Sequence, residues 1–229
     1  MTKRKLERFA EMKNFPNVFE PSFEEVFQKN YFLKGKWHQQ VFKNYNPIII
    51  ELGCGKGEYT IELAKKFPEK NFIGIDIKGA RMWRGAKTAL ENNLKNVIFI
   101  RTRIDFINSI FDSNEVDEIW LTFPDPQPKK VKKRLTSSKF LNMYKQFLKK
   151  PALIHLKTDN DLLFQYTYEL VNFNGLTIIE KIDNIYEKNY DNDILYIQTF
   201  YEKQFLKENK NIHYLSFLID EKEIKELPE

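Results

Sequence analysis

The sequence has one cysteine, three histidines and no long apolar run. The single cysteine, Cys54, excludes an intrachain disulfide, and the histidines lie far apart, without the spacing of metal ligands. No apolar stretch is long enough to cross a bilayer, and the N-terminus, MTKRKLERFAEM, lacks the apolar core of a secretory signal. We therefore expect a cytoplasmic protein that holds no metal and does not bind a membrane.

The chain is large enough for one α/β domain. It has 229 residues and a mass of 27.5 kDa, and 42% of the residues are hydrophobic while 30% are charged. The formal net charge of +5 and the pI of about 9.0 suit an anionic partner, but such values are also common in soluble proteins with solvated lysines. We expect a single domain over residues 1–229, as a monomer or a homodimer.

Short β-branched runs alternate with longer segments of helical periodicity from residue 47 onward. This alternation is typical of a doubly wound, mostly parallel sheet with helices on both faces, so we predict an α/β fold. The expected strands cover residues 47–53, 71–76, 96–101, 117–123, 152–158, 176–182 and 194–201. The expected helices cover residues 58–67, 80–92, 104–111, 137–149 and 160–173.

The first 45 residues differ from the rest of the chain. They are aromatic and charged, and they show no strand pattern. Ser22 lies three residues before Glu25, a spacing typical of a capping box at the start of a short helix. We interpret residues 1–45 as an N-terminal extension packed on the domain.

Three glycines follow the first strong strand. In IIIELGCGKGEY, Gly53, Gly55 and Gly57 lie between an expected strand and an expected helix, where glycine permits positive φ and close approach of a ligand to the backbone. A dinucleotide fingerprint would place its third glycine at position 58. This chain has Glu58 there, and its carboxylate would oppose a pyrophosphate at the helix N-terminus. A nicotinamide dinucleotide is therefore disfavoured.

Two acids at successive strand ends favour S-adenosylmethionine as the ligand. This cofactor has no phosphate and carries a sulfonium and an ammonium group, so it tolerates an acidic loop. Glu51 at the end of the first strand suits the cationic methionine end, and Asp76 at the end of the second can accept hydrogen bonds from both ribose hydroxyls. The alternative is an ordinary tight turn flanked by solvated acids.

An aspartate between two prolines follows the fourth expected strand. In FPDPQPKKVKKRLT, Asp125 lies at the same carboxyl edge as Glu51 and Asp76, and Pro124 and Pro126 restrict the backbone around it, as a positioned carboxylate requires. The basic residues that follow are Lys129, Lys130, Lys132, Lys133 and Arg134. A solvated face is the usual interpretation of such a run alone, but beside a cofactor site we favour contacts with nucleic-acid phosphates.

The fifth expected strand ends in HLKTDN, which adds Asp159 to the same edge. Its carboxylate can accept hydrogen bonds from the N1–H and N2–H groups of a guanine. On sequence alone, Asp159 is explained equally well as a helix-capping acid before residues 160–173.

Five motifs occur together in the order ELGCGKG, IGID, FPDPQPKKVKKRLT, HLKTDN and QTFYEKQF. With them, residues 45–205 resemble bacterial tRNA (guanine-N7-)-methyltransferases, which methylate a guanine in the tRNA variable loop. The resemblance implies a class I methyltransferase fold, with a seven-stranded sheet whose last strand is antiparallel. It also implies S-adenosyl-L-methionine as the cofactor and tRNA as the partner.

The same resemblance implies roles for individual residues, with Asp125 catalytic at the junction of cofactor and substrate. The chain departs from the family at Arg103, where an acidic residue is usual and Asp105 follows two positions later, and at Gln127, where many members have tryptophan. The implied cofactor positions are Glu51, Gly53, Gly55, Gly57, Asp76, Arg103 and Asp125. The implied substrate positions are Lys129, Asp159, Thr199 and Glu202.

Guanine N7 has a free lone pair and carries no proton, so it can attack a sulfonium methyl group directly. No strong base or covalent nucleophile is needed, and the sequence shows no evident Ser, Cys or His arrangement. We expect catalysis by alignment of the reacting atoms, with electrostatic support from Asp125 and Asp159. Three alternatives stay open: a methyltransferase acting on an exocyclic amine, a non-catalytic RNA-binding protein of the same fold and, least favoured, a nicotinamide dehydrogenase.

Overall fold

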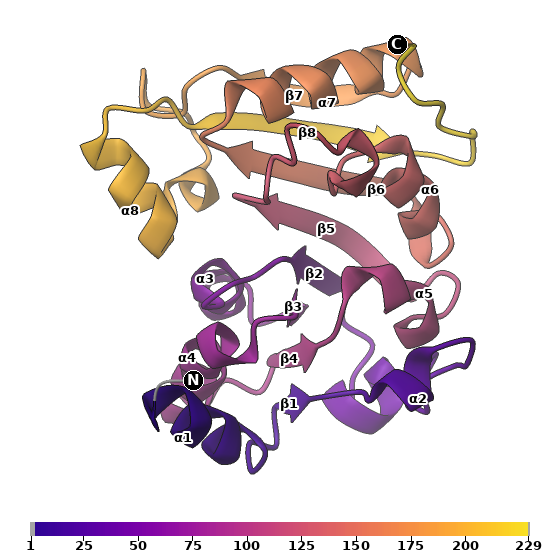
Figure 1. The fold of residues 1–229 in the computed structure, drawn as a ribbon, viewed down its shortest axis with the longest axis vertical. Coiled ribbons are helices and arrows are strands. Elements are labelled where there is room, and N and C mark those ends of the chain that lie inside the picture. Colours follow the sequence, from indigo (N-terminus) through magenta and orange to yellow (C-terminus); the bar gives the residue numbers. More distant parts are fainter. Residues whose placement is uncertain (1–2, 229) are drawn as a thin grey trace.

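The computed structural model describes residues 3–228, and Figure 1 shows their arrangement. Within these residues, eight strands form one sheet in the order β1-β4-β3-β2-β5-β6-β8-β7. The strands are β1 (Val18–Phe19), β2 (Ile48–Leu52), β3 (Asn71–Asp76), β4 (Val97–Arg101), β5 (Val116–Thr122), β6 (Leu148–Thr158), β7 (Ile178–Ile182) and β8 (His213–Ile219). All neighbours from β1 to β6 are parallel, whereas β8 is antiparallel to both β6 and β7.

Helices cover both faces of the sheet (Figure 1). The helices are α1 (Lys3–Met12), α2 (Phe23–Val26), α3 (Glu58–Lys66), α4 (Gly79–Glu91), α5 (Ile107–Ile110), α6 (Ser138–Tyr144), α7 (Asp161–Phe173) and α8 (Phe200–Lys207). Shorter or irregular turns are η1 (Trp37–Phe42), η2 (Ile104–Phe106), η3 (Val131–Lys133) and η4 (Asp193–Tyr196). One apolar core joins the sheet to α5, α6 and α7, and a second joins it to α3 and α4.

The central strands β2 and β3 are buried and mostly apolar because helices cover both of their faces. All five residues of β2, with the sequence IIIEL, are buried, and the first five residues of β3 are buried as well. A strand that faces solvent on one side would instead alternate between apolar and polar residues. The exception in β2 is Glu51, a buried carboxylate at the end of the strand.

The predicted doubly wound α/β fold is confirmed, with one misplaced strand. Six of the predicted strands correspond to β2 to β7, but the prediction of a strand at 194–201 is wrong. That segment forms η4 and the start of α8, because Thr199 and Glu202 make a capping box that begins a helix at Phe200. The last strand is β8, which is antiparallel as expected.

The N-terminal segment adds an eighth strand, so the expected number of seven is corrected. The two residues of β1 pair in parallel with Phe99 and Ile100 of β4, although the sequence there shows no strand pattern. Two paired residues are too few for a periodicity to appear. Further along, the Glu25 carboxylate accepts a hydrogen bond from the Ser22 N–H at 2.8 Å, and Trp37 is fully buried in the core.

Gly57 is held where a side chain would not fit. It has a φ of +70°, and a Cβ built on it would lie 2.5 Å from Cε1 of the Phe99 ring and 3.4 Å from the Gly85 Cα. Gly175 has a similar φ of +62°, but a Cβ there would meet no atom within 4 Å. A substitution at Gly175 therefore tests backbone strain alone, whereas a substitution at Gly57 tests strain together with crowding against Phe99.

We expect Gly175→Ala to lower the free energy of unfolding by about 1–2 kcal/mol, the cost of a left-handed backbone for a residue with a Cβ. Gly57→Ala should cost about 1–3 kcal/mol more, because the same strain is joined by overpacking against Phe99. Urea unfolding of both variants measures the difference. Equal decreases would show that the Phe99 ring moves aside without cost.

Candidate active site

The main cleft lies at the carboxyl edge of the parallel strands, above the junction of β2 and β5. From β2 the chain continues to β3 and β4 on one side, and it returns to β5 on the other side. Ligands of open α/β sheets bind where the connections diverge in this way. The cleft has a volume of about 630 Å³ and is lined by the loops after β2, β3, β5 and β6 and by the start of α8.

The glycine loop is bound to the end of β3. Gly53 and Gly55 have φ values of +79° and +57°, and both line the cleft. Asp76 accepts hydrogen bonds from the N–H of Gly55 at 2.9 Å and from the N–H of Lys78 at 2.7 Å. Its carboxylate therefore fixes the loop while it also lines the cleft, whereas Gly57 packs on Phe99 behind it.

Glu51 lies beneath the loop and is closed off from solvent. Its carboxylate accepts hydrogen bonds from the Thr60 N–H at 2.9 Å and from the hydroxyls of Thr60 and Thr122. Burial raises the pKa of Glu51 to about 7, although these hydrogen bonds act in the opposite direction. The sequence placed Glu51 at the strand end, but it gave no indication of this burial.

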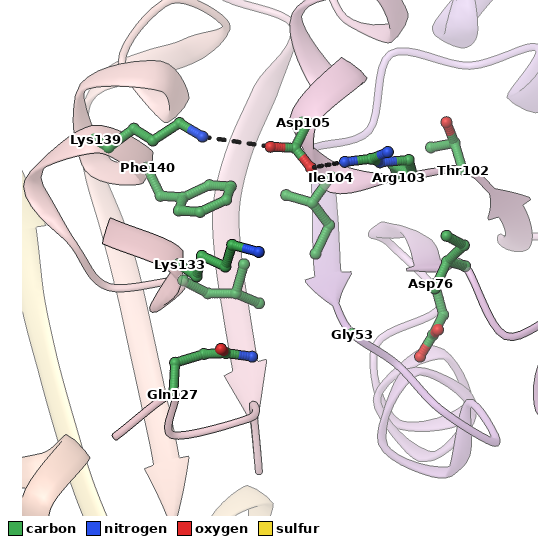
Figure 2. Close-up of a pocket in the computed structure, with 12 residues that line it drawn as sticks. Gly53, Asp76, Thr102, Arg103, Ile104, Asp105, Gln127, Lys133, Lys139 and Phe140 are labelled. Atoms are coloured by element: carbon green, nitrogen blue, oxygen red, sulfur yellow. Dashed lines mark hydrogen bonds and ion pairs between the residues drawn. The ribbon is translucent and has the colours of Figure 1, made fainter. Parts of the chain in front are cut away.

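A second cavity of about 310 Å³ adjoins the cleft and shares Gly53, Asp76 and Gln127 with it. Figure 2 shows its polar and apolar walls, with Ile104 and Phe140 among the side chains. Its other lining residues are Ile77, Thr102, Arg103, Asp105, Lys133, Leu135 and Lys139. This mixed lining suits a flat aromatic ring with polar edges.

Arg103, at the position where the resemblance implies an acidic residue, lines this second cavity. Asp105 pairs with Arg103 and with Lys139, each at 3.3 Å, and the nearby cations lower its pKa against the effect of burial. A carboxylate is therefore present at this wall despite the substitution.

The turn after β5 presents Asp125 to the main cleft. Phe123 and Gln127 flank the turn with φ values of +50° and +45°, and the Phe123 N–H donates to the Lys157 carbonyl at 2.8 Å. Asp125 itself is exposed and accepts a hydrogen bond from the Gln127 N–H at 3.2 Å. Pro124 is buried, so the turn is anchored on the strand side and open at the carboxylate.

The basic run divides into exposed lysines and one buried arginine. Lys129, Lys130, Lys132 and Lys133 are exposed, and Lys133 lines both cavities. The expected phosphate contact by Arg134 is wrong, because only 5% of this residue is exposed. Its Nε donates to the Pro126 carbonyl at 3.1 Å, and its guanidinium lies 4.3 Å from the centre of the Tyr166 ring. Arg134 therefore supports the turn from below.

Asp159 lines the cleft, and the adjacent residue caps α7. The Asn160 side chain accepts the Leu163 N–H at 2.9 Å, so Asn160 provides the N-cap that the sequence allowed for Asp159. Asp159 is paired with Lys210 at 3.1 Å, which contributes to a raised pKa of the lysine. Its role as a substrate contact stays a prediction.

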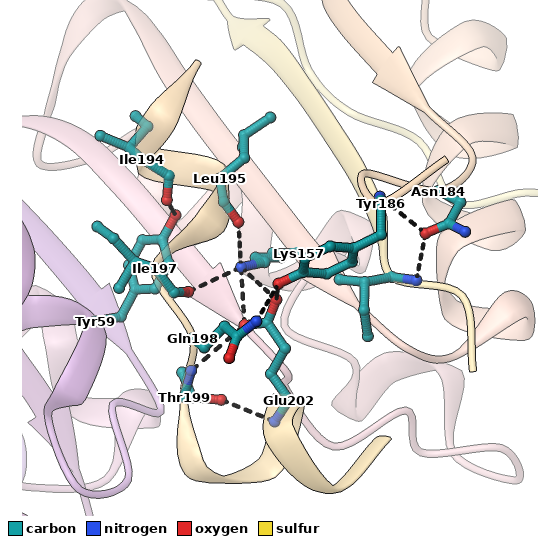
Figure 3. A network of polar contacts seen from close by, with 11 residues as sticks. Tyr59, Lys157, Asn184, Tyr186, Ile194, Leu195, Ile197, Gln198, Thr199 and Glu202 are labelled. Atoms are coloured by element: carbon teal, nitrogen blue, oxygen red, sulfur yellow. Dashed lines mark hydrogen bonds and ion pairs between the residues drawn. The ribbon is translucent and has the colours of Figure 1, made fainter. Parts of the chain in front are cut away.

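A buried ion pair fixes α8 against β6, as Figure 3 shows. Lys157 and Glu202 have fully buried side chains, and their charged atoms are 2.8 Å apart. Lys157 also donates to the carbonyls of Leu195 at 2.6 Å and Ile197 at 3.0 Å, while the Tyr186 hydroxyl donates to Glu202 at 2.8 Å. Desolvation lowers the pKa of Lys157 and raises that of Glu202.

The expected substrate positions in this segment therefore differ in access. Thr199 lines the cleft and caps α8 through a hydrogen bond from the Glu202 N–H at 3.2 Å. Glu202 has no exposed surface and lies behind Thr199. Its carboxylate pairs with Lys157 and accepts a hydrogen bond from the Tyr186 hydroxyl. A direct contact of either residue with substrate stays a prediction.

The sequence analysis missed Lys157 as a structural residue, and it assigned Arg134 to phosphate contacts and not to the support of the turn. A lysine near the end of the largely apolar strand ALIHLKT is a detectable signal, because a lysine is almost never fully buried without a partner. Arg134 had no such signal, since it follows four exposed lysines in a single run.

Comparison with known proteins identifies the family. A family described as "Putative methyltransferase" matches residues 45–215. A tRNA (guanine-N(7)-)-methyltransferase of Christiangramia forsetii is 53% identical over 221 residues, with 95% of this chain and 99% of the relative covered. One of Bacteroides fragilis is 49% identical over 227 residues, with 99% and 90% covered. The chain belongs to the tRNA (guanine-N(7)-)-methyltransferase family. The predicted resemblance is thus confirmed, and the chain is a methyltransferase that uses S-adenosyl-L-methionine.

Solved structures support the fold of the methyltransferase. An antibiotic-related methyltransferase has a TM-score of 0.62 at 22% identity, covering 85% of this chain and 98% of that chain. The 16S rRNA methyltransferase KamB has a TM-score of 0.61 at 14% identity, covering 80% and 92%. In the described part of the methyltransferase, no helix has the length and apolarity to span a membrane, and no group of three or more His, Cys, Asp or Glu residues could hold a metal ion.

The raised pKa of Glu51 predicts a specific dependence of stability on pH. The folded pKa of about 7 exceeds the ordinary value of 4.5, so the carboxyl stabilises the fold below pH 4.5 and this contribution is lost as the pH rises through 7. Relative to Glu51→Gln, the wild type should lose about 3 kcal/mol of unfolding free energy between pH 4.5 and 8. Urea unfolding across that range measures the difference. A difference independent of pH would contradict the raised pKa.

The buried ion pair predicts a strong energetic coupling. Glu202→Gln keeps a side chain that can cap α8 but leaves Lys157 buried without a carboxylate, so we expect the free energy of unfolding to fall by about 3–5 kcal/mol. Lys157→Met should cost a similar amount because it leaves Glu202 unpaired. The double variant should be destabilised by much less than the sum of the two, as measured by urea unfolding. Additive effects would show that the two charges do not stabilise each other.

Proposed function

We propose that the methyltransferase transfers the methyl group of S-adenosyl-L-methionine to N7 of a guanine in the variable loop of tRNA and so forms 7-methylguanosine. The observation that carries this proposal is the exposed Asp125 carboxylate, which a buried strand and a restricted turn present to the main cleft. The membership of the tRNA (guanine-N(7)-)-methyltransferase family supports the target atom and the RNA.

The residues around the glycine loop fit the cofactor. A Cβ added at Gly53 or Gly55 would meet its nearest atom at 4.0 Å, so a ligand can approach the backbone there. Asp76 provides a carboxylate beside the loop for the ribose hydroxyls, and the wall formed by Ile104, Leu135 and Phe140 suits the adenine. S-Adenosylmethionine supplies a methyl group on a positively charged sulfur, which the N7 lone pair of guanine accepts without prior deprotonation.

Glu51 acts on the cofactor site from below the loop. The Glu51 carboxylate is hydrogen-bonded to Thr60 and Thr122. We propose that it keeps these hydrogen bonds when the cofactor binds, and that it favours the cationic methionine end by its charge and by holding the glycine loop. With a pKa of about 7, Glu51 is partly protonated at neutral pH, and a bound cation would favour its ionised form.

Asp125 and Asp159 are placed to orient the guanine and to support its developing charge. Both carboxylates line the main cleft, one at the end of β5 and the other at the end of β6. Positive charge moves from sulfur to the purine during the transfer, so a carboxylate that lies nearer to the purine than to the sulfur lowers the barrier. Asp159 can also accept hydrogen bonds from the N1–H and N2–H edge of guanine.

The exposed lysines after the turn bind the RNA backbone in this proposal. Lys129, Lys130, Lys132 and Lys133 lie beside the cleft, and phosphates are the anions that such a group attracts in tRNA. We further propose that residues 1–229 act as one domain, because Trp37 of the N-terminal segment belongs to the same core as β2 and β5. We also propose that the protein acts in the cytoplasm.

Replacing the central carboxylate tests the mechanism. Asp125→Ala should lower the rate of methyl transfer by about 100-fold to 1,000-fold, because it removes a charge aligned with the reacting atoms, while tRNA affinity changes little. The rate is measured in single turnover by borohydride reduction and aniline cleavage of tRNA, which cuts at 7-methylguanosine. Asp183→Asn, which changes an exposed acid paired with Lys181 outside the cleft, is the control.

Three results would reject this assignment. Near-normal turnover of Asp125→Ala would remove Asp125 from the reaction. Methyl incorporation into tRNA without aniline cleavage would move the target to another atom, as in a methyltransferase acting on an exocyclic amine. Absence of both incorporation and cofactor binding would favour an RNA-binding protein that shares the fold.

A further inference from the structure

The wall of the cleft opposite the turn also carries unpaired positive charge. Lys56 lies in the glycine loop, and Lys78 and Arg81 lie at the start of α4; all three line the main cleft. We call these three residues the α4 rim. Among residues 3–228, no carboxylate forms an ion pair with any of them, whereas Arg84 and Lys87 on the same helix pair with Glu91 and Glu11 at 2.7 Å.

Two aromatic side chains at the start of α8 contact the cations of the α4 rim. The Lys56 Nζ lies 3.3 Å from the centre of the Phe200 ring, and the Arg81 guanidinium lies 5.4 Å from the centre of the Tyr201 ring. The Phe200 N–H donates to the Glu58 carboxylate at 2.7 Å, which fixes the start of α8 beside the glycine loop. Phe200 is 41% exposed, and Tyr201 lines the cleft.

Charge is therefore separated within the cleft. The carboxylates of Glu58, Asp76, Asp125 and Asp159 line it, and the Glu58 carboxylate is engaged by the Phe200 N–H. They repel phosphate while they suit a sulfonium and a purine. The uncompensated cations lie on two sides, on the turn after β5 and on the α4 rim. A polyanion bound here is consequently drawn to the sides of the cleft and kept away from its carboxylates.

A nucleotide whose base enters a cleft has a phosphate on its 5′ side and another on its 3′ side. The sugar–phosphate chain therefore runs across the mouth of the cleft, with phosphates on both sides of the inserted base. The lysines after the turn lie on one side of the cleft, so they can bind phosphates on only one side of the base. Exposed aromatic rings that alternate with cations are the arrangement by which proteins bind single-stranded segments, through phosphate contacts and base stacking.

We propose that the α4 rim, with Phe200, forms a second RNA contact on the far wall of the cleft. Lys56 and Arg81 bind phosphates on the side of the target guanine opposite to the lysines after the turn, and Phe200 stacks against a neighbouring base. This proposal rests on the proposed function, because it takes the base that enters the cleft to belong to tRNA.

The test is the salt dependence of tRNA binding by the double variant Lys56→Ala/Arg81→Ala. Removing one phosphate contact should lower the slope of log Kd against log salt concentration by about 0.7–0.9, so removing two should lower it by about 1.5. The affinity should fall by about 10-fold or more at low salt. The matched control is Arg84→Ala/Lys87→Ala, which removes the same charge from α4 at cations that are already paired, and its slope should equal that of the wild type.

Phe200→Ala separates stacking from charge. We expect it to weaken tRNA binding by about 10-fold without a change of the salt slope, because stacking of a base on the ring is not an ionic interaction. Unchanged affinity would remove Phe200 from the RNA contact.

Two outcomes would overturn the α4 rim as an RNA contact. One is a wild-type salt slope for the double variant. The other is a selective decrease of S-adenosylmethionine affinity, measured by calorimetry, which would assign the cations to the carboxylate of the cofactor. Aniline cleavage by the wild-type protein is measured in parallel. Cleavage with an unchanged slope rejects only the α4 rim, whereas no cleavage rejects the proposed function itself.

Discussion

The parallel pairing of β2 with β5 is the constraint on which the whole cleft depends. Ile50 pairs with Ile119 and Glu51 with Trp120 in the centre of the sheet, although the paired residues are 69 positions apart in the chain. The chain leaves β2 toward β3 and leaves β5 toward β6, so the two connections diverge from this junction. The glycine loop and the turn that carries Asp125 then face each other across an open space. Every proposed role of an acid or a lysine assumes this juxtaposition.

Much of the architecture could be predicted from the sequence because the central strands are covered on both faces. A strand such as IIIEL is apolar at nearly every position, and the acids that end β2 and β3 then stand out at one edge. The same reasoning failed for ILYIQTFY at 194–201. Its apolar and β-branched residues suit a strand, but the local capping box of Thr199 and Glu202 begins a helix there.

The direction of a polar side chain was the part of the site that the sequence could not supply. Arg134 is indistinguishable from its lysine neighbours in a one-dimensional run, yet it turns inward to the Pro126 carbonyl and the Tyr166 ring. Glu202 suits a surface contact until Lys157 of a distant strand is seen to occupy its carboxylate. Both outcomes depend on a partner far along the chain, which no local pattern encodes.

The two walls of the cleft differ in how they are held, and this has a mechanical consequence. Glu202 both caps α8 and neutralises the buried Lys157, so α8 cannot slide or unwind without exposing an unpaired charge to an apolar interior. The buried ion pair therefore holds the α8 wall in place. The opposite wall is a short turn whose lysines are exposed, and the Phe123 N–H and the Arg134 side chain hold it. The α8 wall is therefore held by a buried side-chain ion pair, whereas the turn that carries Asp125 is held by a main-chain hydrogen bond and by the Arg134 side chain.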